Sequence, residues 1–114
     1  TFGGNPVTTA AGLAAIKFIE AQEILSKVEK QGAHLMQELA LIPGVKEVRG
    51  AGLLLGIELE SLKASDVSDA MRAAGVLVNA ANATTIRIAP ALIVTDAQIN
   101  KFISLFRKVV ADAK

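Results

Sequence analysis

Arg87 is the side chain in this sequence best suited to binding a small ligand. It lies within a short run of alternating residues, 85–88, that Pro90 ends. A period of two places Arg87 on the strand face opposite Ile86 and Ile88. A guanidinium on a rigid strand can donate two parallel hydrogen bonds to a carboxylate. The residues alone leave two interpretations, a carboxylate-binding arginine or an edge-strand arginine that pairs with a surface acid.

Thr1 is a second candidate, because it precedes a turn-forming segment at the start of the chain. Gly3 and Gly4 allow a tight backbone, Asn5 is a good helix N-cap, and Pro6 suits the first helical position. A hydroxyl and a backbone N–H beside two glycines could hold a phosphate. No initiator methionine is present, so we expect this loop to continue a longer polypeptide. We expect it to bring Thr1 to a molecule outside the chain. The alternative is a terminal threonine that binds nothing and precedes a helix.

The glycines at 50, 52 and 56 are predicted to be structural. Their spacing is G-x-G-x-x-x-G and they lead into a strand, whereas a dinucleotide-binding loop has the spacing G-x-G-x-x-G and opens a helix. A turn between two short strands is the simpler interpretation.

His34, Glu58 and Glu60 are not expected to catalyse a reaction. His34 is the only histidine, and no serine, cysteine or second histidine accompanies it to form a triad or a metal site; we expect a partly exposed helical side chain. Glu58 and Glu60 share a strand face before a polar loop, where paired acids are ordinarily solvated. No catalytic residue and no metal ligand is therefore assigned.

The composition argues against several classes of partner. Twelve basic and eleven acidic residues give a formal net charge of +1, and their scattered positions do not form the basic surface of a nucleic-acid or membrane binder. The apolar run at 51–57 is too short to span a bilayer. Cysteine is absent, which is compatible with the cytoplasm, where we expect the protein.

A chain of 114 residues with 52% apolar content is expected to form one core. Residues 7–19 predict a helix that is apolar on nearly all sides and that normally packs against a larger body. After a break at 21–23, an amphipathic helix runs from 24 to the Pro43-Gly44 pair.

The rest of the chain alternates short strands and helices. We expect strands at 45–49, 53–59, 76–78 and 85–88, a helix capped by Ser65, and a last helix that starts at a Thr95-to-Gln98 capping box. This order predicts an α+β fold, with a small, mostly antiparallel sheet covered on one face by helices.

Three segments, in this order, resemble the C-terminal part of class III (ornithine-type) pyridoxal-phosphate aminotransferases, and acetylornithine-type members in particular. The segments are TFGGNP at 1–6, EVRGAGLLLGIEL at 47–59, and GVLVN at 75–79 followed by IRIAP at 86–90. The resemblance covers essentially the whole chain. It implies that residues 1–22 are an interface loop and linking helix, and that residues 23–114 are the small C-terminal domain of a fold type I enzyme.

The resemblance also implies roles for two residues. Thr1 would bind the phosphate of the pyridoxal 5'-phosphate held by the neighbouring subunit of a homodimer, and Arg87 would bind the substrate α-carboxylate. In ornithine- and 4-aminobutyrate-type relatives the matching arginine instead pairs with an active-site glutamate before substrate arrives. The segment 49–52 would be a structural turn of the small domain.

The implied parent enzyme transfers the δ-amino group of N-acetylornithine to 2-oxoglutarate in arginine biosynthesis. The Schiff-base lysine and the acid at the pyridine nitrogen belong to the family's large domain, which comes before Thr1. We therefore expect this chain alone to be inactive and to hold no cofactor. The alternatives are another ω-aminotransferase, acting on ornithine, succinylornithine or 4-aminobutyrate, and a free-standing module that binds amino acids or dimerises.

Overall fold

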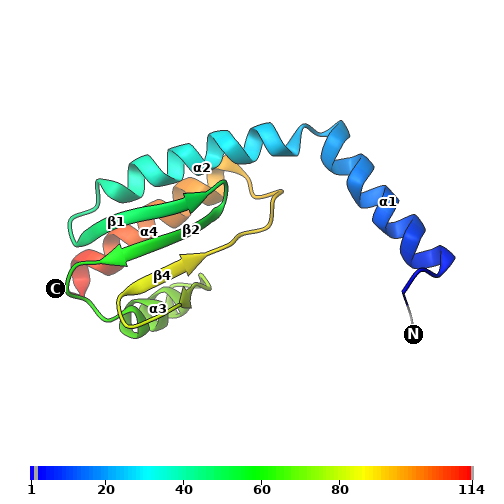
Figure 1. Ribbon diagram of the computed structural model, residues 1–114. Helices are drawn as coiled ribbons and strands as arrows, with labels where there is room; N and C mark the ends of the chain where they lie inside the picture. The colour runs from blue at the N-terminus through cyan, green and yellow to red at the C-terminus, as the bar shows by residue number, and fades with distance from the viewer. Residues whose placement is uncertain (2, 114) are drawn as a thin grey trace.

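The computed structural model describes residue 1 and residues 3–113. Within them the elements follow one another as α1 (Pro6–Ala21), α2 (Ile24–Ala40), β1 (Val45–Ala51), β2 (Leu54–Leu59), α3 (Ala64–Ala73), β3 (Asn79–Ala80), β4 (Thr85–Ile88) and α4 (Asp96–Asp112) (Figure 1).

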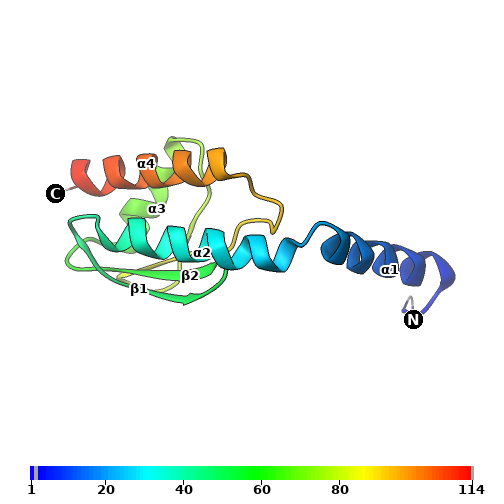
Figure 2. The ribbon, with the colours of Figure 1, turned by 90° about the horizontal axis from the view of Figure 1, so that it is seen from above.

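The four strands form one sheet in the order β1-β2-β4-β3, and every pairing is antiparallel. Helices α2, α3 and α4 lie on one side of this sheet, while its other side carries no described helix (Figure 2). The expected α+β fold, with an antiparallel sheet covered on one face, is confirmed.

The core forms where alternating strand residues meet the apolar stripes of the helices. In β2, Leu55, Ile57 and Leu59 are buried and the residues between them are not. Helix α4 contributes residues spaced three or four apart: Ile99, Ile103, Phe106 and Val110. Burying one such side chain stabilises the fold by about 1.5–3 kcal/mol, so the one-sided sheet is held mainly by this layer.

The two predicted helix starts have different outcomes. At α4, Thr95 accepts a hydrogen bond from the Gln98 N–H and the Gln98 side chain accepts one from the Thr95 N–H, so the capping box is confirmed. At α3 the prediction is wrong, because the N-cap is Lys63 and Ser65 lies inside the helix. The Ala64 N–H instead donates to the Ala83 carbonyl at 2.9 Å, so a distant segment of chain satisfies this helix end.

The predicted strand at 76–78 is also wrong. Only Asn79 and Ala80 pair with β4, opposite Arg87 and Ile86. Continuing this antiparallel register would bring 76 opposite Pro90, which has no N–H to donate. The hairpin of β1 and β2 was predicted correctly, except that β1 continues through Gly50 and Ala51 and β2 begins at Leu54 rather than at 53.

Helix α1 projects away from the rest of the molecule (Figure 1). None of its residues is buried. Its large apolar side chains are exposed on several sides, with 78% of Val7, 53% of Leu13 and 56% of Ile16 accessible. The expected helix that is apolar on nearly all sides is confirmed. The packing of this helix on a larger body and the division of the chain at 22/23 stay predictions. Within the described residues, no helix combines the length and hydrophobicity needed to cross a membrane.

Helix α2 approaches the β1-β2 turn closely at Gly32. A Cβ atom added there would lie 2.2 Å from the Gly52 carbonyl oxygen, and Gly52 itself has φ +53. Two residues without side chains therefore let the helix and the turn touch through their backbones.

We predict that Gly32→Ala lowers the free energy of unfolding by about 1–3 kcal/mol, because overlap with backbone atoms forces the helix away from the turn. This loss is the net effect that remains after the roughly 1 kcal/mol that alanine contributes to an unstrained helix. Urea denaturation measures the change. Gly12→Ala is the matched control, because nothing lies within 4 Å of that added Cβ atom, and it should not destabilise the chain. A Gly32→Ala variant as stable as the parent chain would contradict the close approach.

Candidate functional site

The face of the sheet away from the helices carries most of the charged strand residues. Arg87 is exposed there, while Ile86 and Ile88 on either side of it are buried. Its strand and its face are therefore as predicted. Arg49 lies on the same face, since both arginines pair with Gly56 of the central strand, one from each side. We refer to this surface as the open face.

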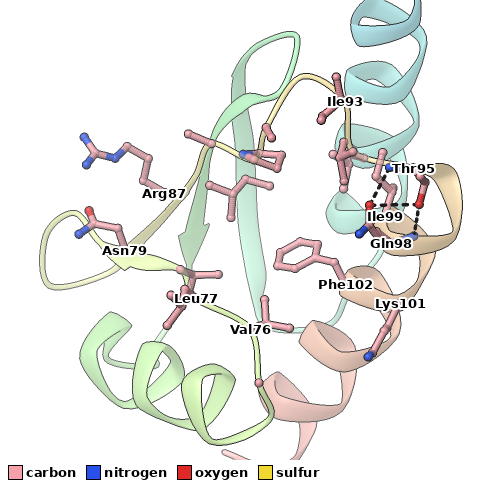
Figure 3. Close-up of a pocket in the computed structure, with 18 residues that line it drawn as sticks. Val76, Leu77, Asn79, Arg87, Ile93, Thr95, Gln98, Ile99, Lys101 and Phe102 are labelled. Atoms are coloured by element: carbon pink, nitrogen blue, oxygen red, sulfur yellow. Dashed lines mark hydrogen bonds between the residues drawn. The ribbon is translucent and has the colours of Figure 1, made fainter.

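Asn79 is the cross-strand partner of Arg87 on its other side. Both side chains point the same way, away from the interior of the molecule (Figure 3). An amide beside a guanidinium adds hydrogen-bonding groups next to a bound carboxylate. Asn79 could not be identified from the sequence, because segment 79–82 has the residue types of a turn and the two-residue pairing with β4 leaves no periodic signal.

Glu58 is held at the centre of a polar cluster on the open face. Its Oε1 accepts from the Thr84 hydroxyl and its Oε2 from the Thr85 hydroxyl, each at 2.5 Å. Arg49 Nη2 donates to Oε2 at 3.2 Å. The two threonine hydrogen bonds and then Arg49 lower the pKa of Glu58 from 4.5 to about 2.

The expectation that Glu58 and Glu60 are a solvated pair is therefore wrong for Glu58, whose side chain is 19% exposed and fully partnered. It is right for Glu60, which is exposed beyond the end of β2. A carboxylate that stays ionised at neutral pH cannot donate a proton, so Glu58 orders its neighbours rather than acting as an acid.

A cavity of about 1070 Å³ lies between the segment before β3, the loop after β4 and helix α4. Its lining is mainly apolar, and Val76 and Phe102 point into it (Figure 3). The Arg87 guanidinium points away from it. Thr95 and Gln98 reach its edge but are engaged in the capping box. This cavity therefore offers mainly apolar contacts to a ligand, since the polar side chains named here are engaged elsewhere or point away from it.

Thr1 and Arg87 are not brought together. The N-terminus lies at the far end of α1, well away from the sheet in both ribbon views (Figures 1 and 2). Thr1 is exposed, Gly4 has φ +76, and Asn5 caps α1 by accepting from the Val7 and Thr8 N–H groups. The predicted Asn5 cap is confirmed, and residue 2 of the predicted loop lies outside the described residues.

His34 is exposed on α2, and its Nε2 lies 3.1 Å from Asn100 Oδ1. No cluster of three metal-binding side chains occurs within residue 1 and residues 3–113. The expectation of a surface helical histidine is confirmed.

The described residues do not form a pyridoxal-phosphate site. The cofactor's aldehyde requires a lysine of lowered pKa in a desolvated setting. Every described lysine is exposed instead: these are Lys17, Lys27, Lys30, Lys46, Lys63, Lys101 and Lys108. No chemical step on the cofactor is therefore assigned to this chain.

We predict that Glu58→Gln removes one acid-sensitive contribution to stability. The folded-state pKa lies below the ordinary value, so the ionised side chain stabilises the fold above pH 4.5 and loses this effect as the pH falls toward 2. The unfolding free energy of the unmodified chain should therefore fall more steeply with acid than that of the variant. Chemical denaturation between pH 2 and 7 measures this slope. Glu60→Gln is the exposed control and should keep the steep slope; equal slopes for all three proteins would contradict the Glu58 cluster.

Comparisons with known proteins give one consistent result. The model of the aminotransferase class-III family matches residues 1–110. The acetylornithine aminotransferase of Mycolicibacterium smegmatis is 46% identical over 99% of this chain and 30% of its own length. The corresponding protein of Mycobacterium leprae is 44% identical over 91% of this chain and 26% of its own length. This chain thus spans under a third of these relatives.

A solved structure shares both fold and sequence. The crystal structure of acetylornithine aminotransferase from Elizabethkingia anophelis superimposes with a TM-score of 0.90 at 28% identity, covering 98% of this chain and 31% of that one. The agreement of the family match with this structural similarity leads to one conclusion: the chain belongs to the class-III aminotransferases.

Proposed function

We propose that this chain is the small C-terminal domain of an acetylornithine-type aminotransferase, a cytoplasmic homodimer of arginine biosynthesis that uses pyridoxal 5'-phosphate. The parent enzyme would transfer the δ-amino group of N-acetylornithine to 2-oxoglutarate. The observation that carries the proposal is Arg87, an exposed guanidinium that makes no ion pair with any described residue. The names of the relatives support the substrate class.

Arg87 would bind the substrate α-carboxylate. The strand fixes its backbone through pairing on both sides, with Gly56 and with Asn79. A planar guanidinium matches the two oxygens of a carboxylate, and a strand-fixed one loses little freedom on binding. Anchoring the α-carboxylate leaves the δ-amino end of the substrate extended toward the cofactor.

Thr1 would act in the other active site of the dimer. Its position at the tip of the projecting helix suits a residue that reaches beyond its own subunit (Figure 1). There its hydroxyl would donate to the cofactor phosphate of the neighbouring subunit, a charge-assisted hydrogen bond. The cofactor supplies the electron sink when bound, and the family's large domain supplies its lysine.

Ornithine, succinylornithine and 4-aminobutyrate are less favoured as substrates, because the relatives compared above are acetylornithine aminotransferases. Steady-state kinetics of the parent enzyme with each amine would separate these substrates. A free-standing amino-acid-binding module is also less favoured; saturable binding of ornithine or arginine to the 114-residue chain, measured by calorimetry, would support it instead.

We predict that Arg87→Ala in the full-length enzyme lowers kcat/KM for N-acetylornithine by about 10- to 150-fold. This range corresponds to the roughly 1.5–3 kcal/mol typical of hydrogen bonds to a charged group. The kcat/KM of Arg87→Lys should lie between those of the unmodified enzyme and Arg87→Ala, because lysine keeps the charge and loses the bidentate geometry. Arg72→Ala is the matched control, since Arg72 pairs with Asp69 on the surface of α3, and its kinetics should not change. Unchanged kinetics for Arg87→Ala would contradict the proposed role.

We also predict that the 114-residue chain forms no specific covalent adduct with pyridoxal 5'-phosphate and has no transaminase activity. Absorbance titration with the cofactor, followed by borohydride reduction and peptide mapping, provides the test. Modification spread over exposed lysines agrees with the prediction. A single modified lysine together with turnover would refute it.

A further inference from the structure

We propose that Glu58 directs the incoming substrate carboxylate to Arg87 by pairing with Arg49, so that Arg49 does not compete for the carboxylate. The inference rests on the proposed function of Arg87 and assigns Glu58 a positioning role, since it touches Arg49 and two threonines rather than the substrate. Three features of the open face support it: the placement of the two arginines, the contacts that engage Arg49, and the rigidity of Glu58.

Arg49 and Arg87 are potential competitors for one anion. Each pairs with Gly56, from opposite sides of the central strand. Two strand spacings therefore separate their backbones, about 9.6 Å. Glycine places no side chain between them, and both side chains are long enough to lean across the gap. A carboxylate arriving at this surface would meet two guanidinium groups unless one of them were engaged.

Arg49 is engaged on two sides. Its Nη2 lies 3.2 Å from Glu58 Oε2, and its Nη1 lies 3.7 Å from Glu47 Oε2. Arg87 has no such contact among the described residues. Of the two arginines on the open face, Arg87 is therefore the one whose charge is not engaged.

Glu58 is better suited to this task than an ordinary surface acid. An exposed ion pair contributes little, partly because two flexible side chains must be ordered to form it. Here the Thr84 and Thr85 hydroxyls already fix the carboxylate, and β2 fixes its backbone. Arg49 thus meets an acceptor that is ordered in advance. The low pKa of Glu58 keeps the acceptor charged over the whole neutral range.

A double-mutant cycle in the full-length, cofactor-loaded enzyme tests the proposal. The four proteins are the unmodified enzyme, Glu58→Gln, Arg49→Ala and the double variant. Glutamine keeps polar groups for the two threonines and removes the charge that holds Arg49. We expect Glu58→Gln to raise the KM for N-acetylornithine about three- to fivefold, with kcat changed less than about twofold. Arg49→Ala should resemble the unmodified enzyme, and the double variant should recover its KM.

The recovery is the decisive result. If Glu58 only braced the threonines, removing Arg49 could not restore the KM, so a double variant as impaired as Glu58→Gln would overturn the proposal. An unchanged KM for Glu58→Gln would also overturn it. If Glu58→Gln does not fold, Glu58→Asp replaces it in the cycle, because the shorter side chain keeps a carboxylate near the threonines and draws it back from Arg49. A rise in KM and its recovery with Arg49→Ala are again expected; no rise overturns the proposal.

A binding measurement separates this inference from the proposed function. Calorimetry gives the Kd of glutarate, a simple dicarboxylate probe, for the same four proteins and for Arg87→Ala. We expect weakened binding in Glu58→Gln, recovery in the double variant, and loss in Arg87→Ala. An enzyme that shows this order but does not use N-acetylornithine would contradict the proposed substrate and support the role of Glu58. Equal Kd values in the four proteins would overturn the role of Glu58.

Discussion

The register of β2 with its two neighbours determines which chemistry this chain can offer. Gly56 lies opposite Arg49 on one side and Arg87 on the other. Successive side chains in a strand alternate between faces, so a slip of one residue would turn Arg87 into the core and expose Ile86 and Ile88. Burial of Leu55, Ile57 and Leu59 prevents this slip. The apolar layer therefore fixes the functional side chain without touching it.

Features that depend on neighbouring residues could be predicted from the sequence. The face of Arg87 follows from its two isoleucine neighbours, and the start of α4 follows from Thr95 and Gln98. The Glu58 cluster could not be predicted, because its hydroxyl donors lie 26 and 27 residues further along the chain. Such contacts depend on the order and register of strands, which no local pattern specifies. The uncapped start of α3 was missed for the same reason, since its partner is Ala83.

The two candidate residues also differ in how they are held. Arg87 lies in a strand paired on both sides, above a buried layer. Thr1 lies at the end of a helix with no buried residue. The apolar side chains of this helix are exposed to water, and burying them against another surface would be favourable. The packing of this helix on a larger body stays a prediction; the chain spans 26 to 30% of the length of the relatives compared.

The roles proposed for Arg87 and Thr1 make different demands on the chain. A residue that must discriminate between carboxylates needs a fixed direction, because bidentate hydrogen bonding tolerates little misalignment. The sheet supplies that direction for Arg87 through backbone pairing with Gly56 and Asn79. A residue that adds one hydrogen bond to a phosphate held elsewhere requires reach more than rigidity, and a helix of 16 residues supplies reach. The proposed selectivity therefore depends on the packed sheet, whose pairing holds Arg87, and the proposed reach depends on the helix that projects from it.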